Sequence, residues 1–74
     1  MITISRPEEI PIEKIHKALR HYGTKWCRLS CGNPEALLAF AALNGVALKF
    51  FQEGCFVVPA GESQRLIEAG AEKA

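Results

Sequence analysis

The hydrophobic pattern between Asn33 and Gly45 is that of a helix. Eight apolar residues run from Ala36 to Leu43, and their spacing puts a wide apolar stripe on one side. Asn33 and Pro34 are typical of a helix start, because asparagine accepts a free backbone amide and proline has no amide to leave unpaired. Gly45 is the expected stop, since glycine enters the left-handed conformation without a Cβ clash. The pattern therefore predicts a strongly apolar helix at the centre of the chain.

Beyond this helix the pattern changes from helical spacing to alternation. Side chains over 46–51 would point to two sides in turn, which predicts a strand. Glu53-Gly54 has the form of a two-residue hairpin turn, so 55–58 is expected to return beside the first strand. This turn would set Phe51 opposite Phe56.

The remaining elements follow from shorter patterns. The sequence predicts a strand at 2–4, a turn at 5–10, a helix at 11–22, a strand at 24–30 and a helix at 62–73. The resulting order is βαβαββα. We expect an α+β fold, a compact two-layer sandwich in which the helices pack on one face of a small mixed sheet. A length of 74 residues allows one domain, residues 1–74.

Composition narrows the function that we expect. The three cysteines are an odd number, which argues against a closed disulfide framework. Reduced thiols, with no signal peptide and no long apolar run, favour the cytoplasm and no membrane interaction. Aspartate is absent and both histidines fall in one expected helix, so we expect no Ser-His-Asp set and no enzymatic activity.

Metal and cofactor chemistry are not expected either. The cysteines match no standard paired metal-ligand spacing, and no nucleotide-binding loop is present. Cys31 stays open as a reactive thiol, because it lies just before the start of the central helix, where a helix dipole favours a thiolate.

Positive charge is concentrated in the first half of a chain whose net charge is +1. In the helix expected at 11–22, four basic residues lie away from the apolar stripe: Lys14, Lys17, Arg20 and His21. At these spacings they would form one cationic strip, which suits an acidic protein surface or phosphate groups. A solvated surface is the alternative, because small domains also scatter charge for solubility.

Strand alternation predicts a second candidate surface, on the sheet face away from the first two helices. Its residues would be Trp26, Arg28, Lys49, Phe51 and Phe56. Aromatic and cationic groups on one face are typical of protein interfaces and of single-stranded nucleic-acid sites. The C-terminal helix could instead fold across this face and bury the two phenylalanines.

Two segments resemble known families. The sequence PIEKIHKAL at 11–19, in a βαβαββ order over residues 2–58, resembles the small sulfur-carrier proteins of the TusA type. That resemblance implies a carrier fold without its carrier cysteine, because the family's C-P-x-P motif reads EEIP at 8–11. The sequence AALNGV at 41–46 is similar to helix-turn-helix proteins, and this implies DNA binding through a recognition helix that starts at Val46.

These patterns favour a small, non-enzymatic binding or regulatory protein. The expected partner is acidic, either another protein or a second copy of this chain, engaged through the cationic strip and the aromatic sheet face. Nucleic acid is the alternative ligand for the same groups.

Overall fold

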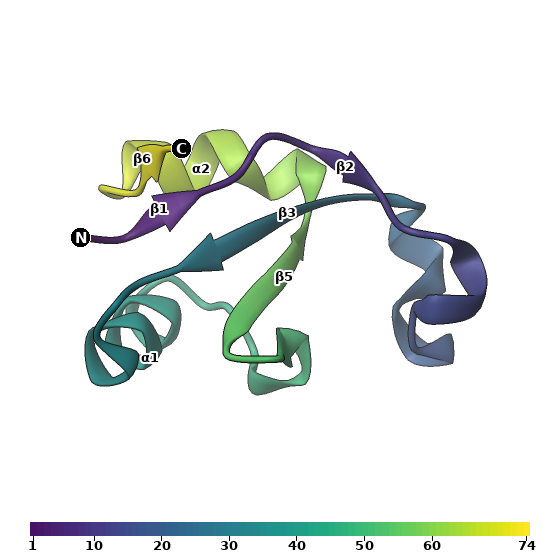
Figure 1. The fold of residues 1–74 in the computed structure, drawn as a ribbon, viewed down its shortest axis with the longest axis horizontal. Coiled ribbons are helices and arrows are strands. Elements are labelled where there is room, and N and C mark those ends of the chain that lie inside the picture. Colours follow the sequence, from purple (N-terminus) through teal and green to yellow (C-terminus); the bar gives the residue numbers. More distant parts are fainter.

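Strand β3 (Lys25–Ser30) lies at the centre of a six-stranded mixed sheet in the computed structural model, which describes residues 1–74. The strands follow the order β4-β5-β3-β1-β6, and β2 also pairs with β3 (Figure 1). The other strands are β1 (Thr3–Ile4), β2 (Glu8–Glu9), β4 (Phe51–Gln52), β5 (Cys55–Pro59) and β6 (Glu72–Lys73). The β1–β6 pair is parallel and the other pairs are antiparallel. The expected α+β class with a mixed sheet is therefore confirmed.

Two α-helices and four 3₁₀ helices complete the fold. Helix α1 spans Pro34–Leu43 and α2 spans Ser63–Glu68. The 3₁₀ helices are η1 (Ile12–Lys14), η2 (Lys17–Tyr22), η3 (Leu48–Phe50) and η4 (Ala60–Glu62). No helix combines the length and the apolar character that crossing a membrane requires.

Helix α1 forms where the sequence predicts it. The Asn33 side-chain oxygen accepts the backbone N–H groups of Glu35 and Ala36 at 3.0 and 3.3 Å, which satisfies two free amides of the first turn. Gly45 has a φ of 71°, the left-handed conformation expected just after the helix. One face of α1 is buried through Leu37 and Ala41.

Two hydrophobic clusters lie on opposite faces of β3. Cys27 and Leu29 point into the larger cluster, which includes residues of both α-helices. Trp26 points the other way, into a smaller cluster that joins it to 12–22 and β5 through Ile15, Leu19 and Val57. The two α-helices therefore share one face, but the first helical segment covers the other face. In this detail the prediction of helices on one face is wrong.

The path from β1 to β3 explains this difference. β1 pairs antiparallel with one half of β3, and β2 continues along the other half. Residues 10–24 are therefore the long loop of an antiparallel hairpin. A βαβ order instead predicts a parallel crossover connection of fixed handedness. A hairpin loop can fold over either face, and here burial of Trp26 holds it on the face opposite α1.

The single helix predicted at 11–22 is wrong, because η1 and η2 are separated at Ile15 and His16. Ile15 is extended, with φ −94° and ψ 130°. The His16 Nδ1 accepts the N–H of Ala18 at 3.1 Å and caps η2, and Arg20 Nε donates to the Ile15 carbonyl at 2.9 Å. The break turns Ile15 into the smaller cluster, so packing outweighs helical spacing.

The strand predicted over 46–51 forms only at its far end. Residues Leu48–Phe50 wind into η3, and the Phe50 N–H donates to the Ala47 carbonyl at 3.1 Å. The Phe50 ring lies 5.7 Å from the Tyr22 ring and 6.5 Å from the Trp26 ring, centroid to centroid. Aromatic packing thus holds this segment, which has no strand partner, in place before β4 begins.

The hairpin turn itself is confirmed. Glu53 and Gly54 have φ of 52° and 82°, the positive values that a type I′ turn requires at both central positions. Phe51 pairs with Phe56, as predicted.

The ends of the chain pair with each other. Helix α2 is shorter than the helix predicted at 62–73, and Gly70, with a φ of 123°, lies between it and β6. Residues Glu72–Lys73 pair with β1, although fraying was expected there. Residues Glu8–Glu9, expected within a turn, form β2. β2 and β6 consist of charged residues, so they lack the β-branched pattern that identifies β1 in the sequence.

Candidate functional site

A groove of about 690 Å³ lies over the sheet face that carries Trp26, between the segment 10–20 and the β4–β5 hairpin. Five cationic side chains line it: Lys14, Lys17, Arg20, Arg28 and Lys49. Two carboxylates, those of Glu13 and Glu53, also line the groove. The chain has nine lysines and arginines against eight acidic residues. The groove therefore holds more than half of the cations but a quarter of the carboxylates.

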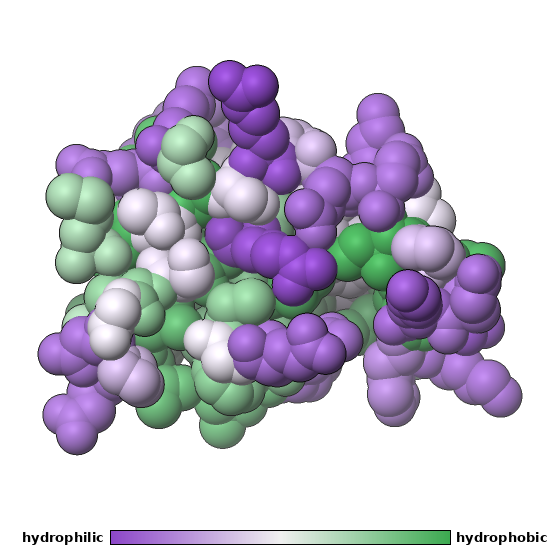
Figure 2. All heavy atoms as spheres, in the orientation of Figure 1, coloured by the Kyte–Doolittle hydropathy of each residue, from purple (hydrophilic) through white to green (hydrophobic).

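The groove unites two surfaces that the sequence predicts separately. The cationic strip comes from η1 and η2, and the aromatic and basic face comes from β3, η3 and β4. Both line the same hollow, because 12–22 folds over the Trp26 face. Figure 2 shows hydrophilic atoms over the right-hand end of the molecule, where Figure 1 draws the segment 11–22. Seven of the nine predicted site residues are lining residues, the exceptions being His21 and Phe56.

Trp26 forms the floor of the groove but does not reach solvent. It is 2% exposed, and its indole N–H donates to the Gly23 carbonyl at 3.1 Å. The Tyr22 and Phe50 rings pack against it. The predicted role of Trp26 in an open aromatic face is wrong, because η1 and η2 cover it.

The two predicted phenylalanines, Phe51 and Phe56, pack against each other but differ in exposure. Phe56 pairs with Leu29 across the sheet, which puts it in the larger cluster at 0% exposure. Its placement on the open face is therefore wrong, because it lies one residue from Val57 and points to the opposite side. Phe51 is 44% exposed at the hairpin end, with its ring 5.1 Å from that of Phe56. Phe51 lies at the edge of the groove, but its ring packs on the Phe56 side of the hairpin, away from Trp26.

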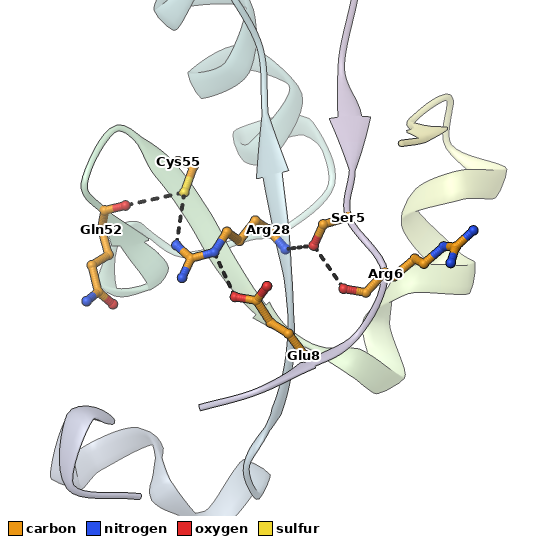
Figure 3. A network of polar contacts seen from close by, with 6 residues as sticks. All are labelled: Ser5, Arg6, Glu8, Arg28, Gln52 and Cys55. Carbon is orange, nitrogen blue, oxygen red and sulfur yellow. Dashed lines mark hydrogen bonds and ion pairs between the residues drawn. The ribbon is translucent and has the colours of Figure 1, made fainter. Parts of the chain in front are cut away.

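Arg28 is the most heavily bonded cation of the groove. Figure 3 shows its side chain reaching from β3 towards the hairpin, with Glu8 on one side and Cys55 on the other. Its Nε donates to Glu8 Oε1 at 2.8 Å, and its Nη1 lies 4.0 Å from Cys55 Sγ. Its backbone N–H donates to Ser5 Oγ at 2.8 Å. The pKa of Arg28 is raised, first by the hydrogen bond to Glu8 and then by Cys55.

The lysines of the groove have no carboxylate partner. The two ion pairs in the structure are Arg28–Glu8 and Arg65–Glu62. Lys14, Lys17 and Lys49 therefore keep their charge available, and the Lys49 ammonium lies 5.4 Å from the centre of the Phe50 ring. Unpaired ammonium groups beside aromatic rings suit a ligand that brings its own negative charge.

His21 lies outside the groove. Its ring is tilted against Tyr22, with centroids 4.1 Å apart, and its side chain is exposed. A straight α-helix would have placed it beside Lys14 and Lys17, but the break at Ile15 redirects it.

The cysteines differ in their surroundings, and all three are unpaired. Cys27 is buried, and burial raises its pKa, with a smaller contribution from the charge of Glu8. Cys31 is partly buried, and its sulfur accepts the Asn33 N–H at 3.4 Å. Cys55 donates to the Gln52 carbonyl at 3.4 Å. No three His, Cys, Asp or Glu side chains come together in a way that could hold a metal ion.

Sequence reasoning missed Glu8 and Phe50 as parts of this site. Glu8 was assigned to a turn, and only its pairing opposite Trp26 brings it to Arg28. Phe50 was assigned to a strand, and η3 turns its ring against Trp26.

Comparisons with protein-family models, with curated proteins and with solved structures gave no match. The fold also differs from both resemblances that the sequence suggests. A helix-turn-helix protein needs a second helix after α1, and η3 has three residues. The βαβ crossover expected from a sulfur-carrier order is replaced by the antiparallel pairing of β1 and β3.

Proposed function

We propose that this chain is a non-enzymatic binding protein whose groove holds an acidic, extended segment of a partner protein. The observation that carries the proposal is the concentration of Lys14, Lys17 and Lys49, without carboxylate partners, along one groove. The net charge of the whole chain is only +1, so the excess of positive charge in the groove does not follow from its overall composition. Complementary charge raises the rate of encounter and sets specificity.

The shape of the groove supports an extended ligand. Its cations come from two walls, with η1 and η2 on one side and Lys49 of η3 on the other, and Arg28 of β3 lies between them. The partly buried Phe50 ring, which packs against Trp26, adds apolar surface between them. A peptide with alternating acidic and apolar residues matches this arrangement, because successive side chains of an extended chain point to opposite sides.

Single-stranded nucleic acid is the competing ligand class. Base stacking needs exposed ring faces. Of the three aromatic residues expected to stack, Trp26 and Phe56 are buried and Phe51 alone is exposed. One exposed ring favours a protein segment over a run of stacked bases.

Direct binding measurements test this proposal. A fluorescent polyglutamate peptide and a labelled single-stranded oligonucleotide of similar charge would each be titrated with the protein at low salt, by fluorescence polarisation. We expect the peptide to bind. The double reversal Lys14→Glu and Lys17→Glu should weaken binding by about two- to thirtyfold, since each reversed charge changes a surface interaction by about 0.2–1 kcal/mol and the two together by about 0.4–2 kcal/mol.

A matched control uses two lysines outside the groove. Lys25→Glu with Lys73→Glu changes the net charge by the same amount, and both side chains are exposed and absent from the groove. Equal loss in both double variants, or no peptide binding by the wild type, contradicts the proposal. Tighter lysine-dependent binding of the oligonucleotide would favour the nucleic-acid alternative.

The proposal includes a cytoplasmic location. It is supported by three unpaired thiols, which fit a reducing compartment.

A further inference from the structure

Helix α1 is apolar on the side that faces solvent as well as on the side that faces the core. Seven of its residues are exposed: Pro34, Glu35, Ala36, Leu38, Ala39, Ala42 and Leu43. Glu35, at the first turn, is the only charged one. Leu43 is 85% exposed and Leu48, just beyond the helix, is 73% exposed. A helix that is hydrophobic all round is normally buried, so this face is expected to be covered.

The outer face also has its own helical spacing. Glu35, Leu38, Ala39, Ala42 and Leu43 follow the pattern i, i+3, i+4, i+7, i+8, which marks one continuous stripe. Figure 2 shows hydrophobic atoms along the bottom edge, left of centre, beside the place where Figure 1 draws α1. None of these five residues lines the groove. The stripe is therefore a second surface, with chemistry unlike that of the groove.

We propose that a second copy of this chain covers the stripe, with the two α1 helices packed antiparallel across a two-fold axis. In such a contact Leu38 of one copy lies opposite Leu43 of the other, and Ala39 lies opposite Ala42. The alanines let the backbones approach closely, and the leucines pack around them. A two-fold contact needs a self-complementary surface, and this register pairs each leucine and each alanine of the stripe with one of like size.

Charges at the two ends of α1 favour antiparallel over parallel packing of the two helices. The Arg65 guanidinium donates to the Asn44 carbonyl at 2.6 Å, so it lies at the C-terminal end of α1. Its Nη2 also lies 3.2 Å from Glu62 Oε1, and its side chain stays 45% exposed, which leaves room for a second carboxylate. Antiparallel packing brings Glu35 of one copy to that end of the other copy, near Arg65. Parallel packing would bring the two Glu35 carboxylates together. The opposed helix dipoles also favour the antiparallel arrangement.

A partner of the stripe must present an uncharged, apolar surface. The stripe has no charge between its ends, so a strongly acidic or basic segment would lose hydration without gaining an ion pair. The chain itself presents the matching surface, an uncharged stripe with Glu35 at one end and the partly exposed Arg65–Glu62 pair at the other. The inference is independent of the ligand proposed for the groove.

Sedimentation and light scattering of the intact chain at about 100 µM, well above a micromolar dissociation constant, test this inference. We expect a dimer. Leu43→Lys should raise the dissociation constant at least about tenfold, because it puts a charge into the apolar contact, opposite Leu38 of the other copy. Ile12→Lys is the matched control, since Ile12 is also an exposed apolar residue but lies on η1; it should leave the dimer unchanged. Circular dichroism verifies that both variants fold.

Charge reversal tests the direction of the helices. Glu35→Lys and Arg65→Glu should each weaken the dimer severalfold, and the double variant should restore it. A role of Arg65 within its own chain alone would not be rescued by a change at Glu35. A monomeric wild type at about 100 µM, a dimer unaffected by Leu43→Lys, or a double variant without rescue would each overturn the proposal.

Discussion

The Nε of Arg28 on β3 lies 2.8 Å from Oε1 of Glu8 on β2. Glu8 pairs directly with Trp26, so Arg28 is its diagonal neighbour across the antiparallel pair, within reach of a long side chain. Both side chains are more than two-fifths exposed, and exposed ion pairs contribute little to stability. The main consequence of the pair is that Glu8 neutralises one cation of the groove from within the chain.

Replacing Glu8 should therefore improve binding of an acidic ligand. Glu8→Gln keeps the size of the side chain but removes the charge that competes for Arg28. We expect the affinity for polyglutamate to rise by up to about fivefold, and the free energy of unfolding to fall by no more than about 1 kcal/mol. Fluorescence polarisation and urea denaturation measure the two effects. Glu9→Gln is the control, because Glu9 bonds to Thr24 outside the groove. An equal gain in that control would mean that net charge alone is responsible.

Trp26 should behave as a core residue. It is 2% exposed between η2, β5 and Phe50, so Trp26→Ala removes a large side chain that the surrounding structure cannot replace. We expect a loss of about 3–5 kcal/mol in the free energy of unfolding. The neighbouring exposed residue gives the comparison, and Lys25→Ala should change stability by no more than about 0.5 kcal/mol.

Fluorescence tests the same placement without a mutation. The chain has one tryptophan, so its emission reports on this position alone. We expect blue-shifted emission and weak quenching by acrylamide in the native protein. Red-shifted emission with ready quenching would mean that η1 and η2 do not cover the sheet.

Helix α1 and the β4–β5 turn were predictable because their signals are local. Asn33, Pro34 and Gly45 cap or end one helix through contacts a few residues away, and Glu53-Gly54 sets one turn. Such signals act within a few residues and need no knowledge of the rest of the fold. The alternation of β3 was equally clear, although which side each cluster occupies was not.

Most residues of the candidate site were predictable from the sequence, but their assembly into one groove was not. Its cations and aromatic groups were identified on two surfaces, and both surfaces depended on a straight helix at 11–22. The helix breaks because Ile15 packs under the sheet and His16 caps the next turn. Both causes are tertiary or side-chain contacts that helical periodicity does not contain. The same break brings the basic residues over Trp26 and removes His21 from them.

The cap at His16 should matter for stability. Its Nδ1 accepts the Ala18 N–H, a role that asparagine can also fill at a helix start. We expect His16→Ala to lower the free energy of unfolding by about 0.5–2 kcal/mol and His16→Asn to recover most of it. Urea denaturation of the two variants measures this. His21→Ala, at an exposed position on the same segment, should change stability by no more than about 0.5 kcal/mol; an effect as large as that of His16→Ala would show that the cap is not responsible.

Cys27 should make stability depend on pH in the alkaline range. Burial raises its pKa above the ordinary value of 9.0, and the charge of Glu8 raises it further. The unfolded chain therefore releases the thiol proton at a lower pH than the folded chain does. The stabilisation is complete below pH 9.0 and is lost as the pH rises towards the folded pKa, at no more than about 1.4 kcal/mol per pH unit. Denaturation of the wild type and of Cys27→Ala across this range isolates the effect, because other groups titrate equally in both. Cys55→Ala, which changes a partly exposed thiol, should keep the wild-type dependence. If Cys27→Ala and the wild type lose stability in parallel, the buried thiol is not the titrating group.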